Sequence, residues 1–176
     1  MFLNAKTVTP VFALLALLIG STPIASRAAD KIVIGQIENV AIGKTQTLFV
    51  AKIDTGAENS SLHAREIKLY KERGQAWVKF RIKNKYGKNY SFKKKVKRMA
   101  TIKRKSAPDQ LRPVVELDLC IGRVHKKVEV NLVDRSNFKY AFLVGKSFLS
   151  GVFLVDVEKS YSLEPQCDRS SRENND

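Results

Sequence analysis

Histidine and cysteine are scarce in this chain of 176 residues, which contains 2 of each. Two cysteines are too few for the disulfide framework of a small secreted domain, and the sequence leaves open whether Cys120 and Cys167 pair. Neither the zinc motif H-E-x-x-H nor the phosphate-binding motif G-x-x-x-x-G-K-[ST] occurs. The chain therefore carries no motif for metalloprotease or nucleotide chemistry, and we expect no cofactor.

Long apolar runs are also missing. The run from Val11 to Ile19 has 9 apolar residues, whereas a membrane-spanning helix needs about 20. Lys6 precedes the run, and Ser26 and Ala28 occupy the −3 and −1 positions of a small-residue cleavage site. This layout predicts a signal peptide over residues 1–28 and an exported, periplasmic mature chain. A buried N-terminal helix is the alternative.

Acidic residues are outnumbered, with 17 Asp and Glu against 32 Lys and Arg, so the formal charge is +15. Loss of Lys6 and Arg27 with the signal peptide would lower it from +15 to +13. Such a balance favours polyanionic partners. The densest basic run extends from Lys93 to Lys105 and lacks the interleaved aromatic residues that stack bases. We therefore expect an anionic membrane surface or an acidic envelope partner there, and no nucleic acid, with a solvated loop as the alternative.

Alternating apolar residues predict strands over most of the mature chain. "AWVKFRIK" alternates strictly and is followed by a turn at Gly87 and an apolar return, which predicts a hairpin. "VVELDLCIG" and "VEVNLV" predict a second hairpin in the same way. Residues 63–74 fit a strand or a helix, and we favour the strand. Many short strands between turns indicate an all-β barrel or sandwich.

The remaining segments complete the predicted domain, residues 29–163. The apolar runs "YAFLVG" and "VFLVDV" are typical of strands buried on both faces, and "KSFLSG" between them predicts one short helix. The charged, proline-containing residues 93–113 predict a mobile loop or an exposed extension. Residues 164–176 are polar and predict a disordered tail.

The strongest candidate for chemistry is Asp54-Thr55-Gly56, which directly follows an apolar strand. Gly56 allows a tight turn and close approach of another backbone, and the Thr55 hydroxyl can hydrogen-bond the nearby backbone. The motif is therefore suited to presenting the Asp54 carboxylate at a strand end. The same residues also form ordinary turns, so the tripeptide alone does not establish a site.

Its surroundings make the motif more specific. "KIDTGA" and the later "AFLVGKSFL" resemble the two paired segments of retropepsin-like aspartic proteases. The segments "AKIDTGAENSSLHA", "RPVVELDL", "VNLVDRSNFKYAFLVGKSFLSG" and "FLVDVEKSY" resemble a bacterial family within that group, long labelled ATP-dependent zinc proteases and associated with RimK-type ligases. The resemblance covers nearly the whole mature chain. It implies a closed acid-protease β-barrel with one short C-terminal helix.

The resemblance also implies an aspartic endopeptidase that acts on a peptide or protein substrate. Asp54 would be the catalytic acid or base, with Thr55 and Gly56 shaping the loop. Aspartic chemistry needs two carboxylates that share one proton, and Asp134 and Asp156 lack a following glycine. A working site therefore requires a homodimer that contributes one Asp54 from each subunit.

Further site residues are expected around this loop. Ala57, Glu58 and Asn59 follow it directly and are the candidate substrate-binding residues, although the family more often has a basic residue where Glu58 stands. Arg112 and Arg135 match family positions, and each would either pair with a carboxylate near the site or brace a loop. "NKYGKNYSF" is the first candidate for a mobile flap over the site, and the basic segment that starts at Lys93 is the second.

Two other functions remain open. A zinc hydrolase, as the family label states, would have to draw ligands from His63, His125, Cys120 and a carboxylate, although a hydrogen-bonded structural role suits His63 better. A non-catalytic module would retain the fold to bind a peptide or an envelope partner. Because catalytic zinc needs three protein ligands and no zinc motif is present, we predict no metal site.

Overall fold

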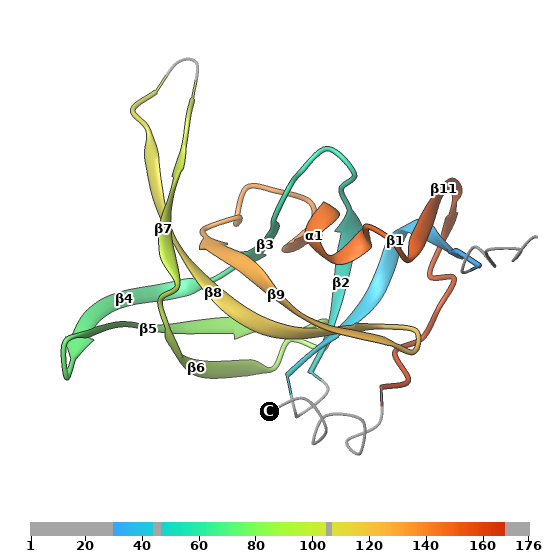
Figure 1. Cartoon of the computed structure of the whole chain (residues 1–176). Coiled ribbons are helices and arrows are strands. Elements are labelled where there is room, and N and C mark those ends of the chain that lie inside the picture. The colour runs from blue at the N-terminus through green and yellow to red at the C-terminus, as the bar shows by residue number, and fades with distance from the viewer. Residues whose placement is uncertain (1–29, 44–46, 105–106, 168–176) are drawn as a thin grey trace, which may run out of the picture.

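β-strands make up almost all of the regular structure. The computed structural model describes residues 30–43, 47–104 and 107–167 (Figure 1). The strands are β1 (Ile32–Ile42), β2 (Thr47–Ile53), β3 (Ser60–His63), β4 (Arg65–Glu72), β5 (Gln75–Lys83), β6 (Asn89–Lys95), β7 (Arg98–Ile102), β8 (Gln110–Ile121), β9 (Val124–Val133), β10 (Phe142–Val144) and β11 (Phe153–Ser160). The short helix α1 (Lys146–Leu149) follows β10, as predicted.

Eight strands form one mixed sheet in the order β11-β1-β2-β10-β3-β9-β8-β7. The sheet curls so that β1 also pairs with β8, through Ala41 opposite Cys120 and Ile42 opposite Leu119. This pairing nearly closes a ring of strands, which confirms the all-β, retropepsin-like expectation. The β8–β9 hairpin turns at Gly122, as the sequence predicted.

Strands β4, β5 and β6 form a separate antiparallel sheet, which lies at the lower left in Figure 1. The predicted alternation of β5 is confirmed, because Val78, Phe80 and Ile82 are buried in the main core. Phe80 stacks on Phe92 of β6 with ring centroids 5.5 Å apart. One face of this sheet therefore covers the core, and the other faces outward.

Of the two alternatives for residues 93–113, the structure supports the exposed extension and not the loop. Apart from residues 105–106, which lie outside the described part, these residues contribute the end of β6, β7 and the start of β8. Their hairpin rises as an arm at the upper left in Figure 1. The expectation for β11 is wrong. Strand β11 is not buried on both faces, because it is at the sheet edge and leaves Leu154 and Val157 exposed by 55% and 69%.

The C-terminal segment is fixed to the sheet by a buried carboxylate. Glu38, which is fully buried, accepts hydrogen bonds from the backbone N–H groups of Gly35, Ser162 and Leu163. Ordered packing extends beyond the predicted domain boundary at residue 163, to Cys167. The predicted signal peptide and residues 168–176 lie outside the described residues. Within the described ranges, no helix has the length and apolar character needed to cross a membrane.

Cys120 and Cys167 form a disulfide that joins β8 to this C-terminal segment. The two cysteines are 47 positions apart in the sequence, and both are buried. The bond therefore closes a long loop whose freedom it restricts in the unfolded chain.

We expect the free energy of unfolding of the double variant Cys120→Ser/Cys167→Ser to be about 2–4 kcal/mol lower than that of the wild type. Denaturant titration with and without a reductant measures the difference. Reductant should destabilise the wild type by a similar amount and leave the double variant unchanged. An unchanged wild type under full reduction would contradict the prediction.

Candidate active site

Strand β10 positions the Asp54 loop by inserting between the two strands that flank it. It pairs parallel to β2, with Val144 opposite Ile53, and antiparallel to β3, with Phe142 opposite Leu62. The Asp54 backbone N–H donates to the Val144 carbonyl at 2.9 Å. The loop between β2 and β3, at the top in Figure 1, is thus anchored to a segment about ninety residues later in the chain.

The loop presents the Asp54 carboxylate through its own backbone. Asp54 Oδ1 accepts hydrogen bonds from the N–H groups of Gly56 at 3.1 Å and Ala57 at 3.2 Å. Asp54 is half-buried, whereas Thr55 and Gly56 are exposed. Within the described residues, the hydrogen bonds to this carboxylate all go to Oδ1. The motif is a turn, and the turn orients a carboxylate.

Gly145 allows the segment after β10 to touch this loop. A Cβ atom at Gly145 would lie 2.7 Å from the Asn59 carbonyl carbon and 2.9 Å from the Ala57 oxygen, which is closer than real Cβ contacts. The Gly145 N–H donates to the buried Ser60 Oγ at 3.1 Å. Only glycine fits this position without moving the loop backbone.

The start of α1 holds the same loop from its other end. The backbone N–H groups of Lys146 and Ser147 donate to the carbonyls of Ala57 at 2.8 Å and Glu58 at 2.9 Å. The Glu58 carboxylate also pairs with Lys146 Nζ at 2.9 Å, on the surface. The acidic residue that departs from the family pattern therefore has a local partner.

A pocket of about 280 Å³ lies beside the loop. The three predicted substrate-binding residues Ala57, Glu58 and Asn59 line it. The other lining residues are Ser61, Arg98, Ala100, Ile102, Arg112, Val114, Asn131, Arg135 and Leu143. The structure thus brings the predicted binding residues together in one cavity next to Asp54.

Two arginines of this pocket are braced by neutral groups. Arg112 donates to the side-chain oxygens of Gln110 and Asn131, and burial is the main cause that lowers its pKa. Arg135 is 9% exposed; its Nε donates to the Tyr140 carbonyl.

The charges of Arg112 and Asp54 both act on Arg135. Burial lowers the pKa of Arg135, the nearby charge of Arg112 lowers it further, and the Asp54 carboxylate opposes both. Sequence reasoning found Arg112 and Arg135 but missed Arg98, whose Nη2 pairs with Glu129 at 2.7 Å. The position of Arg98 depends on the β7–β8 hairpin, which the sequence did not predict.

His63 has a structural place behind the site. Its Nδ1 accepts a hydrogen bond from the Arg135 backbone N–H at 2.8 Å, so this nitrogen carries no proton. Asp134 Oδ1 is 3.4 Å from the same nitrogen, but an unprotonated nitrogen cannot donate to it. Burial lowers the pKa of His63 more than the charge of Asp134 raises it. His63 therefore holds the segment that carries Arg135.

The first flap candidate lies against the start of β2, whereas the Asp54 loop follows the end of that strand. In the turn at residues 84–88, the Lys85 backbone N–H donates a hydrogen bond to the Leu48 carbonyl, at the start of β2. Ala100 and Ile102 of β7 instead line the pocket beside Asp54, so the second flap candidate has the suitable position. Cys120 is held in the disulfide. Among the described residues no cluster of three or more metal-ligating side chains occurs.

We expect Gly145→Ala to cost about 1–3 kcal/mol of stability, because the added methyl group must displace the loop backbone. Gly56→Ala is the matched control, since its Cβ would lie 3.4 Å from Asp54 Oδ1, in ordinary contact, and should change stability by less than about 0.5 kcal/mol. Denaturant unfolding of both variants measures the contrast. Equal stabilities would contradict the close packing described here.

Acidification should destabilise the protein through His63. The pKa of His63 is lowered in the folded protein. The contribution of the neutral His63 to the free energy of unfolding is therefore complete above its pKa in the unfolded chain, about 6.5. It is lost as the pH falls from there towards the folded pKa, because the unfolded state takes up the proton first. His63→Gln, whose amide oxygen can accept the Arg135 N–H, should unfold with a smaller pH dependence between about pH 8 and 5. His125→Gln is the control, and an equal reduction in both variants would refute the assignment.

Comparisons with known proteins agree with this geometry. A family model described as "Retropepsin-like aspartic endopeptidase RimB" matches residues 33–166, a range that contains Asp54, Arg135 and Gly145. Two relatives named "Probable alpha-L-glutamate ligase" are 31% identical, one from Shewanella pealeana over 64% of this chain and one from Shewanella halifaxensis over 67%. The chain spans about a quarter of their length, 25% and 26%.

A solved structure is also similar. The crystal structure of Lpg0085, a protein of unknown function from Legionella pneumophila, superposes with a TM-score of 0.64 and 27% sequence identity. The similarity covers 77% of this chain and 100% of that one. Since the family model spans well over half of the sequence and includes the whole Asp54 site, the chain belongs to the RimB-like family of retropepsin-like aspartic endopeptidases.

Proposed function

We propose that this protein is an exported aspartic endopeptidase that works as a homodimer. The observation that carries the proposal is the Asp54 carboxylate, presented on an exposed loop with Oδ1 fixed by the Gly56 and Ala57 N–H groups. Membership of the retropepsin-like family supports the reaction class. The ligase name of the relatives is not carried over, because the chain matches only 25% and 26% of their length.

The homodimer follows from the number of carboxylates that the chemistry needs. Within the described residues, no ion pair or hydrogen bond joins Asp54 to a second acid. Asp134, the nearest candidate from the sequence, is 72% exposed and caps the Ser136 N–H instead. A two-fold axis at the exposed Thr55 and Gly56 would bring the second Asp54 from a partner copy.

Two Asp54 side chains at such an axis would share one proton, since like charges a few ångströms apart do not both ionise. The ionised carboxylate takes a proton from water as the water oxygen bonds to the scissile carbonyl carbon. The protonated carboxyl gives its proton to the carbonyl oxygen. When the resulting diol collapses, the C–N bond breaks, the leaving nitrogen takes the proton of the protonated carboxyl, and one diol hydroxyl returns its proton to the ionised carboxylate, so the dyad again holds one proton.

The adjacent pocket gives the substrate a place and a charge preference. Arg112 and Arg135 face it with neutral hydrogen-bond partners, so an acidic substrate side chain would supply the carboxylate they lack. The β7–β8 arm, which contributes Ala100 and Ile102, would close over the bound peptide and exclude water. We therefore expect peptides with Glu near the scissile bond to be cleaved in preference to their Gln counterparts.

The periplasmic location rests on the predicted signal peptide of residues 1–28. A mature chain that begins at Ala29 in the periplasmic fraction of the producing bacterium would support it. An uncleaved chain in the cytoplasm would overturn it without affecting the proposed chemistry.

We expect Asp54→Asn to abolish peptide cleavage, by at least about a hundredfold, while the dimer persists in sedimentation. Wild-type activity should depend on pH in a bell shape, because the dyad fails when both carboxyls are protonated or both are ionised. A peptide library with matched Glu and Gln pairs, scanned from about pH 4 to pH 8, makes the measurement. Asp156→Asn, in the edge strand β11 where Asp156 accepts the Glu158 N–H, is the control and should cleave like the wild type.

Each rival function predicts a different result. Cleavage that survives Asp54→Asn and disappears with a chelator would favour a zinc hydrolase. A folded monomer that binds peptides without cleaving them would favour the non-catalytic module. Either result would overturn the proposed homodimeric peptidase.

A further inference from the structure

The outer face of the β4–β5–β6 sheet gathers basic side chains away from the Asp54 loop. Because Val78, Phe80 and Ile82 of β5 point into the core, the alternate residues of that strand point outward. The strand register places neighbours from β4 and β6 beside them. The cations of this outer face, here called the basic sheet face, are Lys68, Lys79, Arg81, Lys83, Lys93 and Lys95.

Few of these cations are neutralised. Lys93 pairs with Glu72 at 2.7 Å and Arg81 with Glu66 at 2.8 Å. Within the described residues, the other four lysines of the basic sheet face form no ion pair with a carboxylate. The face therefore carries an excess of positive charge held at fixed spacing by the strand pairing.

Later cations of the basic run that starts at Lys93 are, in contrast, paired with carboxylates. Lys97 pairs with Glu116, Arg98 with Glu129 and Lys103 with Asp109. The structure thus divides the basic run predicted as one partner site. Its lysines Lys93 and Lys95 belong to the basic sheet face, whereas Lys97, Arg98 and Lys103 lie in or next to the β7–β8 arm, where acidic partners offset them.

Two half-buried aromatic rings lie within the basic sheet face, and lysines cover both. Lys93 Nζ and Lys95 Nζ lie 4.7 Å and 5.7 Å from the centre of the Trp77 ring. Lys79 Nζ and Lys93 Nζ lie 5.4 Å and 5.9 Å from the centre of the Tyr70 ring. Rings covered in this way do not offer the open faces on which bases of single-stranded nucleic acid stack.

The basic sheet face is also hollowed. Two cavities of about 560 Å³ and 360 Å³ share Glu66 and Arg81 in their linings. They form where β4 departs from regular pairing between Arg65 and Lys68, with Glu66 in a left-handed backbone conformation of φ 53°. The larger cavity adds Arg65 and Asp134, so its cations and carboxylates balance, whereas the smaller adds Lys68, Lys79 and Lys93. The smaller cavity is therefore bordered by an excess of cations that can surround an anionic group.

We propose that the basic sheet face docks the protein on an anionic phospholipid membrane. Phosphate headgroups complement the unpaired lysines and the smaller, cation-lined cavity. A broad, shallow face with covered rings fits many headgroups at once better than one nucleic-acid strand.

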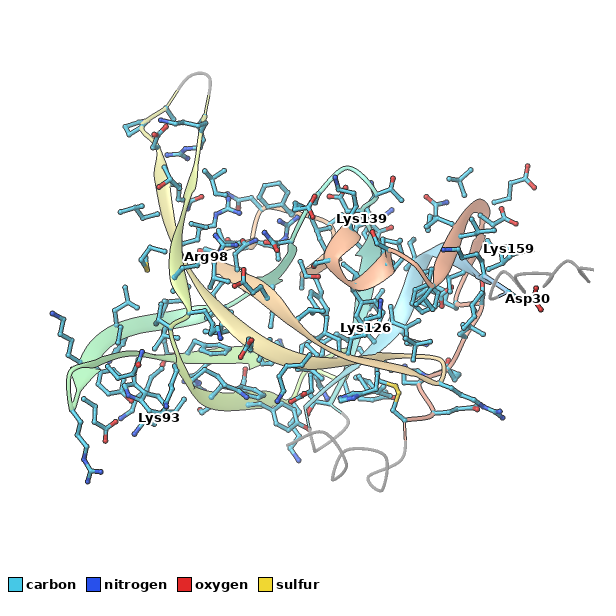
Figure 2. All side chains as sticks on the ribbon, viewed as in Figure 1. Asp30, Lys93, Arg98, Lys126, Lys139 and Lys159 are labelled. Carbon is cyan, nitrogen blue, oxygen red and sulfur yellow. A yellow bond between two sulfur atoms is a disulfide. The ribbon has the colours of Figure 1, made fainter. Side chains whose placement is uncertain are left out.

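This surface is separate from the Asp54 loop. Figure 1 shows the loop between β2 and β3 at the top and the β4–β6 sheet at the lower left, and Figure 2 shows Lys93 beneath that sheet. A protein docked through the basic sheet face would keep its Asp54 loop accessible. The inference does not rest on the proposed peptidase activity.

Vesicle co-sedimentation of the mature chain, residues 29–176, tests the proposal. The wild type should bind phosphatidylcholine vesicles that contain phosphatidylglycerol far more tightly than pure phosphatidylcholine, and added salt should weaken the binding. The variant Lys68→Gln/Lys79→Gln/Lys95→Gln should lose about tenfold or more in partitioning to the anionic vesicles. It keeps Lys93 and its ion pair with Glu72. Asp54→Asn should bind like the wild type.

A control of equal charge separates this surface from net charge. Lys31→Gln/Arg123→Gln/Lys159→Gln removes three exposed cations from other elements, and Figure 2 shows Lys159 at the opposite end of the molecule from Lys93. This variant should retain most of the binding, and equal unfolding midpoints would show that both variants fold. Equal losses in the two variants, or equal binding to neutral vesicles, would overturn the proposal. A single-stranded oligonucleotide provides a further test. The proposal would also be overturned if this oligonucleotide displaced the wild type from vesicles and did not bind the Lys68→Gln/Lys79→Gln/Lys95→Gln variant.

Discussion

The insertion of β10 between β2 and β3 is the constraint on which the site depends. The two strands that flank the Asp54 loop do not pair with one another; each pairs with Phe142–Val144. Gly145 then brings the chain so close to Asn59 and Ala57 that no side chain fits. The loop is therefore fixed from both ends by one distant segment, and local turn geometry alone would not hold it.

This arrangement explains why a small, polar loop can present a carboxylate in a defined direction. The backbone of the Asp54 loop is hydrogen-bonded to Val144, Lys146 and Ser147, so the loop loses little further freedom when a ligand binds. The side chain of Asp54 is in turn oriented by the N–H groups of its own loop. The rest of the ring, including the segment held by Glu38 and the disulfide, supports β1 and β2 beneath it.

The cationic side chains of the chain lie in two different environments. At the pocket, Arg135 is buried and Arg112 half-buried, and the charges of Arg112 and Asp54 both act on Arg135. On the basic sheet face, the lysines stand in solvent and lie over aromatic rings. Charges of the first kind act at short range on a bound group, whereas those of the second kind are screened by salt and attract extended anionic surfaces.

Several features followed from the sequence alone because their causes are local. Alternation set the inward and outward faces of β5, glycine marked the turns at Gly87 and Gly122, and Asp54-Thr55-Gly56 identified the candidate loop. Strand pairing at long range decided what the sequence left open or misplaced. It put β10 between β2 and β3, made β11 an edge strand and turned the basic run into an arm and part of a sheet face. The disulfide and the convergence of Arg98, Arg112 and Arg135 on one pocket were decided in the same way, because they join residues whose distance depends on strand order and not on spacing along the chain.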